Sequence, residues 1–140
     1  MTRNQALALA LALVGLAPLM PLPASAQQSA DVHFQRGNYG TMVSGSIIGD
    51  EYMDYRLGAN AGQRMFVELT VAGSNGSGNL YFNILPPHST GEAIYNGSIY
   101  GNSTTVDLPV SGTYVIRVYH MGNDRDTGRT SGFNLDLSIQ

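Results

Sequence analysis

The stretch Phe133-Asn134-Leu135-Asp136-Leu137-Ser138-Ile139 decides the fold class, because its apolar and polar residues alternate without exception. In an extended strand, successive side chains point to opposite faces, so the odd positions share one face and the even positions the other. One face then packs in a core and the other meets water, as in antiparallel sheets. The stretch therefore predicts a strand that is buried on one side.

The same period of two recurs upstream in three further segments. Their expected core faces are Tyr114, Ile116 and Val118; Met65, Val67, Leu69 and Val71; and Met53, Tyr55 and Leu57. Weaker strand patterns cover residues 41–48, 80–85, 93–94 and 104–108. Clusters of Gly, Asn, Ser and Pro separate these runs, and no segment has the pattern of a three-turn helix. We therefore predict an all-β fold, a single antiparallel β-sandwich of about eight strands with a jelly-roll-like arrangement.

The N-terminal segment, residues 1–26, predicts a cleavable signal peptide. It combines the positive Arg3, an apolar run over residues 6–16, and the small residues Ala24-Ser25-Ala26 before Gln27. The apolar run is too short for a membrane-spanning helix, and no cysteine is present to carry a lipid, so we expect no membrane anchor. The pattern predicts cleavage after Ala26 and a periplasmic or secreted product.

Residues 27–140 remain after cleavage, which is 140 − 26 = 114 residues and the size of one domain. This part contains six arginines and no lysine against ten acidic residues, a formal charge of 6 − 10 = −4. A nucleic-acid partner is not expected, because phosphate binding requires a basic surface. A domain of this size without disulfides must be held together by its core.

The sequence offers no catalytic motif. There is no cysteine nucleophile, and Ser98 and Ser111 lack the surroundings that activate a serine. His33, His88 and His120 do not have metal-ligand spacing, and His120 falls on the core face of its strand, which favours a buried, hydrogen-bonded imidazole. We therefore expect a protein that is not an enzyme and that has no metal site and no cofactor.

One metal site remains open as an alternative. Asp124 and Asp126 stand at alternate positions of a polar loop, as do carboxylates in calcium loops, but the loop lacks the further acidic ligands that such loops contain. The block from Tyr95 to Asn102 mixes aromatic and small polar residues. We interpret this block as a hairpin, although it would also suit a sugar-binding surface.

Four motifs resemble known bacterial proteins. They are G-D-E-Y-M-D-Y-R-L at 49–57, A-G-Q at 61–63, Y-F-N-I-L-P-P at 81–87 and G-T-Y-V-I-R-V-Y at 112–119. Together they resemble the pre-peptidase C-terminal type of β-sandwich and, within it, the periplasmic inhibitors of goose-type (g-type) lysozyme. The resemblance covers about residues 40 to 140, and the 61–63 and 112–114 motifs inform on fold rather than function.

The resemblance implies a protein that blocks the substrate cleft of a g-type lysozyme with loops bearing a tyrosine and arginines. The matching positions are Gly49, Asp50 and Tyr52 in the first motif and Arg125 and Arg129 in the long loop at 123–131. Arginine pairs bidentately with carboxylates, and a tyrosine ring fills an apolar sugar subsite, so these residue types suit a glycosidase cleft. The predicted partner-binding residues are Asp50, Tyr52, Arg56, Arg117, Tyr119, Arg125 and Arg129.

Two alternatives stay open beside the inhibitor. The chain also fits a stand-alone carbohydrate- or protein-binding module of the cell envelope, or a structural envelope protein. Binding modules of the pre-peptidase type normally accompany a catalytic domain, and 114 residues leave no room for one, which favours the inhibitor.

The signal-peptide hypothesis predicts that the mature protein begins at Gln27. Mass spectrometry of the protein recovered from a periplasmic extract should give the mass of residues 27–140. A protein that retains Met1 or the apolar run would contradict the prediction.

Overall fold

The computed structural model describes residues 12, 14–20 and 27–140. The predicted cleavage site, Ala24-Ser25-Ala26, lies outside the described residues. Within the described part of the chain, no helix has the length and apolar character needed to cross a bilayer.

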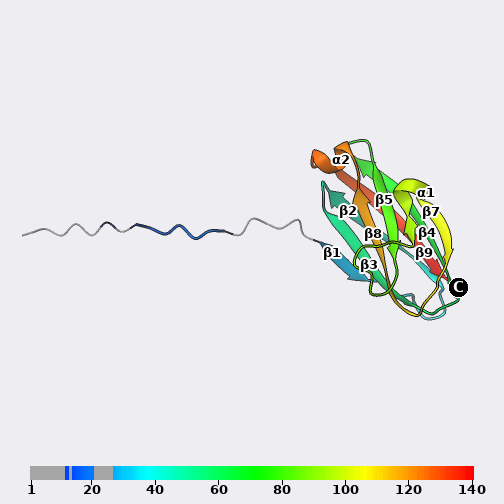
Figure 1. The fold of residues 1–140 in the computed structure, drawn as a ribbon. Coiled ribbons are helices and arrows are strands. Elements are labelled where there is room, and N and C mark those ends of the chain that lie inside the picture. Colours follow the sequence, from blue (N-terminus) through cyan, green and yellow to red (C-terminus); the bar gives the residue numbers. More distant parts are fainter. Residues whose placement is uncertain (1–11, 13, 21–26) are drawn as a thin grey trace, which may run out of the picture.

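The described residues form two facing β-sheets and two one-turn helices (Figure 1). The first sheet contains, in spatial order, β1 (Gln28–Asp31), β3 (Tyr52–Ala59), β8 (Gly112–His120), β5 (Leu80–Leu85) and β6 (Tyr95–Asn96). The second contains β2 (Gly40–Ile48), β9 (Thr130–Ile139), β4 (Arg64–Ser74) and β7 (Ser103–Asp107). The helices are α1 (Gly97–Tyr100) and α2 (Asn123–Asp126). The prediction of an all-β sandwich is confirmed.

The chain crosses between the two sheets at nearly every connection. Successive strands from β2 to β5 lie in alternate sheets, and so do those from β6 to β9. Crossing connections gather at the two ends of the sandwich, so the β2–β3, β4–β5 and β8–β9 connections share one end. All strand pairs are antiparallel except β1 with β3, which is parallel.

The core lies between the sheets and is built by the alternation seen in the sequence. Leu135 and Leu137 of β9 are fully buried and meet Ile116 and Val118 of β8 within one apolar cluster. The predicted inward faces of β3, β8 and β9 are correct. Val71 is the exception, since it is 36% exposed where the β4–β9 register shifts between Val71 and Ser74.

Three details differ from the sequence-based expectation. Strand β1 was not predicted, because its four residues show no apolar alternation. The strand expected at residues 93–94 lies two residues later, as β6, because Ile94 only begins the pairing with Ile84. Residues 97–100 form α1 instead of a hairpin turn, since Asn96 caps them by accepting the backbone N–H of Ser98.

A large-to-small change in this core should be costly. Leu135 is 0% exposed, so Leu135→Ala should lower the free energy of unfolding by about 2 to 5 kcal/mol. Asp136→Ala, on the exposed face of the same strand, is the control and should cost less than about 0.5 kcal/mol. Urea denaturation of both variants measures the difference, and equal costs would contradict the assignment of faces.

Candidate functional site

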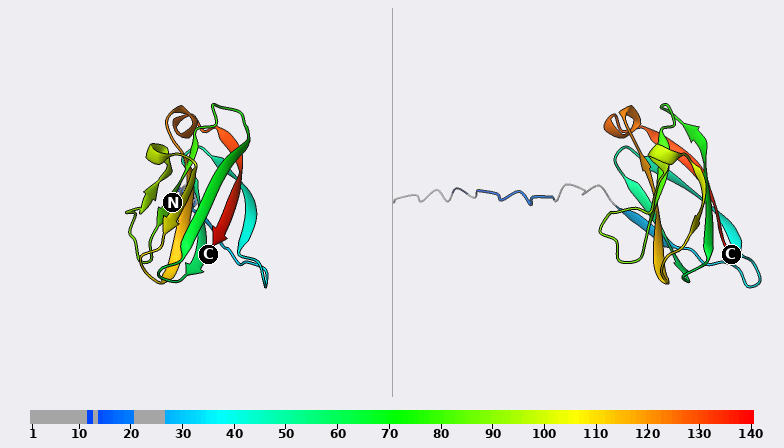
Figure 2. Two further views of the ribbon diagram at one scale, coloured as in Figure 1. Left: turned by 90° about the vertical axis from the view of Figure 1, so that its right-hand side faces the viewer. Right: turned by 45° about the vertical axis from the view of Figure 1, so that its right-hand side comes forward.

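Three connections meet at one end of the sandwich, which we call the loop end (Figure 2). They are the β2–β3 turn (residues 49–51), the β4–β5 loop (75–79) and the β8–β9 loop with α2 (121–129). The backbone N–H of Gly49 donates to the carbonyl of Arg129 at 2.8 Å, and that of Asn75 to the carbonyl of Thr130 at 3.1 Å. The three connections are therefore bound to one another through their backbones.

The carboxylate of Asp124 organises the loop end. Its side chain is 0% exposed, and its two oxygens accept the backbone N–H groups of Ser77 and Asn79, each at 3.0 Å. These hydrogen bonds hold the pKa of Asp124 below its ordinary value of 3.8. Gly76 packs against the same carboxylate, where a side chain would have no room. Asp124 thus anchors the β4–β5 loop onto the β8–β9 loop.

A hydrogen bond from the buried His120 side chain holds the β2–β3 turn in place. The imidazole is 2% exposed, with Nδ1 at 3.0 Å from the carbonyl oxygen of Gly49 and Nε2 at 2.8 Å from Oγ of Ser131. A carbonyl only accepts, so Nδ1 carries the proton. Ser131 in turn bonds Ser74 at 2.8 Å, which includes β4 in the network. The predicted buried, hydrogen-bonded imidazole is confirmed.

The tight turn explains why position 49 is glycine. Gly49 has φ of +56°, in the left-handed region, and an added Cβ would lie 3.1 Å from Cα of Gly128. The close approach brings Asp50, which is exposed, beside the β8–β9 loop.

Four of the seven predicted site residues gather at the loop end. Asp50 lies on the β2–β3 turn, Tyr52 begins β3, and Arg125 and Arg129 project from the β8–β9 loop. Arg125 pairs with its neighbour Asp126 at 3.0 Å, with both side chains at least half exposed, and such exposed pairs stabilise little. Arg129 is exposed and has no ion-pair partner among the described residues. Both guanidinium groups are therefore available to a partner.

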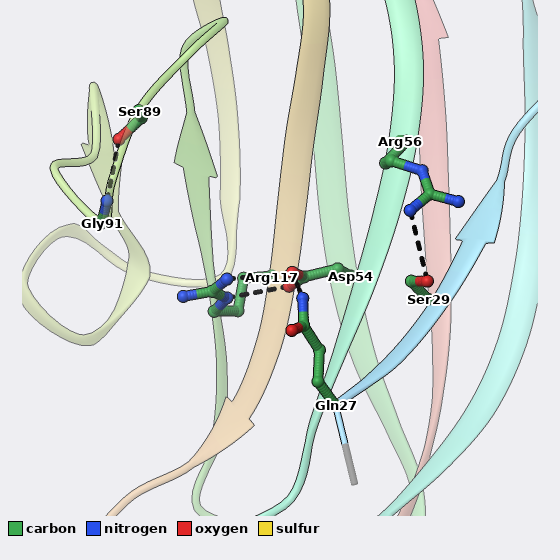
Figure 3. Close-up of polar contacts among 7 residues, drawn as sticks. All are labelled: Gln27, Ser29, Asp54, Arg56, Ser89, Gly91 and Arg117. Carbon is green, nitrogen blue, oxygen red and sulfur yellow. Dashed lines mark hydrogen bonds and ion pairs between the residues drawn. The ribbon is translucent and has the colours of Figure 1, made fainter.

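Arg117 lies instead on the outer face of the first sheet, where it is already paired. Its Nε and Nη2 donate to the two carboxylate oxygens of Asp54 at 2.8 and 2.9 Å, and these bonds raise the pKa of Arg117 (Figure 3). The amide of Gln27 donates to the same carboxylate at 2.7 Å. The guanidinium carbon also lies 4.3 Å from the ring centroid of Tyr52, a cation–π contact that fixes this ring.

Arg56 and Tyr119 also have intramolecular partners. Arg56 pairs with Asp31 at 2.8 Å and donates to Ser29 of β1 at 3.3 Å (Figure 3). The hydroxyl of Tyr119 donates to Oδ1 of Asn83 at 2.7 Å. Both residues therefore lie on the sheet face rather than on the loops, Tyr119 near the loop end and Arg56 further along β3, opposite Val115.

Sequence reasoning missed the burial of Asp54 and Asp124. Asp54 occupies an outward position by alternation, yet it is only 4% exposed, because Arg117 and Gln27 cover it. The burial of Asp54 follows from the β3–β8 register, which places Asp54 opposite Arg117. The sequence of a single strand does not reveal its register with a neighbouring strand. Asp124 stands in a polar loop and has no pattern that marks it as buried.

The arrangement does not form the calcium loop that the sequence left open. Both oxygens of Asp124 face N–H donors, and Asp126 is directed to Arg125, so the two carboxylates do not converge. Among residues 27–140 no group of three or more acidic, histidine or cysteine side chains is placed to hold a metal ion.

The chain is similar to inhibitors of lysozyme. It is 32% identical to a periplasmic inhibitor of g-type lysozyme from Aeromonas hydrophila, with a TM-score of 0.72 over 81% of this chain and 96% of that one. It is 27% identical to the inhibitor of g-type lysozyme from Escherichia coli strain K12, over 89% of this chain and 91% of that protein.

The fold is shared more widely. The pre-peptidase C-terminal domain of a collagenase from Bacillus anthracis superposes with a TM-score of 0.56 over 82% of this chain and 97% of that domain, at 14% identity. That likeness concerns the fold alone. No family model matches the sequence.

The buried carboxylate should control the stability of the loop end. Asp124→Asn removes one of the two acceptors for Ser77 and Asn79 and should lower the melting temperature clearly more than Asp126→Asn, the same change at an exposed position of the same loop.

The difference should also depend on pH. Because the folded-state pKa is lowered, the contribution of Asp124 is fully present above about 3.8 and is lost as the pH falls through the folded-state value. Melting curves recorded from pH 7 to pH 2 should therefore show the wild type and Asp124→Asn converging in acid. A constant gap would contradict the role of the charge.

Proposed function

This chain belongs to the family of periplasmic inhibitors of g-type lysozyme, and we propose that it inhibits such a lysozyme by placing its loop end in the substrate cleft. The similar proteins are inhibitors, so the chain is not an enzyme. The proposed site rests on the backbone hydrogen bond from the N–H of Gly49 to the carbonyl of Arg129. This bond joins two segments distant in sequence at one end of the sandwich.

The arginines supply the chemistry that a glycosidase cleft would recognise. Such a cleft contains carboxylates, one of which is protonated and acts as a general acid. Arg125 and Arg129 are exposed, and the only ion pair of Arg125 is with the solvent-exposed Asp126. A guanidinium that enters the cleft forms charge-assisted hydrogen bonds to a catalytic carboxylate and so occupies the position of the substrate.

Tyr52 supplies a flat ring for a sugar subsite. Its ring lies over Arg117, which Asp54 holds by two hydrogen bonds, so the ring loses little freedom when it binds. We assign direct contact with the lysozyme to Asp50, Tyr52, Arg125 and Arg129. Arg117 positions Tyr52, and Tyr119, which lies opposite Tyr52 on β8, flanks the contact. Arg56 lies further along β3, opposite Val115, and orders the sheet face through its pair with Asp31.

The periplasm is the proposed location. The similar protein from Aeromonas hydrophila is a periplasmic inhibitor of g-type lysozyme, and the N-terminal 26 residues have the features of a signal peptide. The net charge of −4 after cleavage favours a cationic protein partner over nucleic acid. The stand-alone binding module has only fold-level likeness behind it, so we do not adopt it.

Removal of a central side chain should weaken inhibition without unfolding the protein. Tyr52→Ala and Arg125→Ala should each cost about 2 kcal/mol or more in binding, about thirtyfold in affinity, because tyrosine and arginine anchors dominate interfaces. Inhibition of a g-type lysozyme by purified residues 27–140 measures the affinity, and a melting curve checks the fold.

Arg64→Ala is the matched control. Arg64 lies on β4 of the second sheet and forms a highly exposed pair with Asp107 at 3.2 Å, so its removal should leave inhibition unchanged. Full inhibition by both Tyr52→Ala and Arg125→Ala would overturn the site, and no inhibition by the unmutated protein would overturn the proposed function.

A further inference from the structure

An uncharged depression lies where α1 meets the loop end, at Asn79 of the β4–β5 loop and the start of the β8–β9 loop. It is open, has a volume of about 510 Å³, and is lined by Asn79, Tyr81, Ser98, Ile99, Met121 and Gly122. Two apolar side chains on its border are accessible to a partner, since Ile99 is 69% and Met121 39% exposed. No lining residue carries a charge.

The backbone of α1, which carries the exposed Ile99, is fixed at its start. Asn96 caps α1 through the backbone N–H of Ser98 at 3.2 Å, and the N–H of Gly97 donates to Oδ1 of Asn83 at 3.3 Å. Gly97 packs directly on the backbone of Phe82, where an added Cβ would clash. An apolar side chain on a fixed turn loses little entropy when a partner covers it, which is the property of an interface anchor.

The depression is continuous with the residues assigned to the lysozyme contact. The strand registers place Tyr52 opposite Tyr119 and Tyr119 opposite Tyr81, which forms a row of three tyrosines across β3, β8 and β5. The rings of Tyr81 and Tyr119 have centroids 6.4 Å apart, and Tyr81 lines the depression. Figure 2 shows α1 and α2 near the same end of the sandwich in both views.

The four side chains assigned to the lysozyme contact are too few for a stable interface. Specific complexes cover about 800 Å² on each partner, whereas an aromatic side chain contributes about 150 to 250 Å². A contact surface of that size involves about 20 to 30 residues on each partner, whereas only Asp50, Tyr52, Arg125 and Arg129 are assigned to the contact so far. The lysozyme must therefore cover more of the surrounding surface.

We propose that the depression bordered by Ile99 and Met121, on the α1 side of the loop end, is a second, apolar contact region for the same lysozyme. It fits an uncharged, apolar surface at the rim of the cleft, because the partner would desolvate Ile99 and Met121 without burying a charge. The proposal rests on the proposed function. In it, the arginines and Tyr52 block the cleft, and the apolar region adds affinity.

Serine substitutions test the region. Ile99→Ser and Met121→Ser should each raise the Kd for a g-type lysozyme about tenfold, mainly through faster dissociation, because each removes apolar area covered by the partner. Val110→Ser and Met42→Ser are the matched controls, since these side chains are 46% and 61% exposed outside the depression and the loop end. Both controls should bind as the wild type does.

Hydrogen exchange gives an independent readout. The backbone amides of residues 97–101 should become protected when the lysozyme binds. Wild-type affinity in Ile99→Ser and Met121→Ser, with Arg125→Ala still weakened, would overturn this inference and leave the proposed function standing. Failure of the unmutated protein to bind any g-type lysozyme would overturn both.

Discussion

The buried carboxylate of Asp124 is the contact on which the loop end depends. It has no ion-pair partner among the described residues, and backbone N–H groups of the β4–β5 loop solvate it instead of water. A buried charge satisfied in this way is tolerated only in one geometry, so it fixes the two loops relative to each other. His120 adds the β2–β3 turn through Gly49. The sandwich thereby presents three connections as one rigid unit.

The ion pairs divide the four arginines of the predicted site into two groups. Arg117 and Arg56 lie on the sheet face and are paired with Asp54 and Asp31. Arg125 and Arg129 lie on the loops, and neither is held by a buried partner. The internal pairs keep the sheet face ordered, while the loop arginines remain available to a partner, which is the arrangement expected of an inhibitor that meets a carboxylate-lined cleft.

Much of the fold could be predicted because the alternation of apolar and polar residues in a half-buried strand shows which face of the strand is buried. Phe133 to Ile139 indicated both a strand and its buried face, and the motifs indicated the family. Features set by distant contacts were not predictable. Strand β1 exists because it pairs with β3, Val71 is exposed because of a register shift, and Asp54 is covered because Arg117 lies opposite. The burial of Asp124 likewise depends on a loop about 45 residues upstream.

The kinetic type of inhibition tests most directly whether the loop end occupies the substrate cleft of the lysozyme. Initial rates of a g-type lysozyme on a soluble oligosaccharide substrate should be measured at several concentrations of residues 27–140. Occupation of the cleft predicts competition, so the apparent KM should rise with inhibitor concentration while kcat stays unchanged. A fall in kcat with an unchanged KM would place the protein elsewhere on the enzyme and contradict the account.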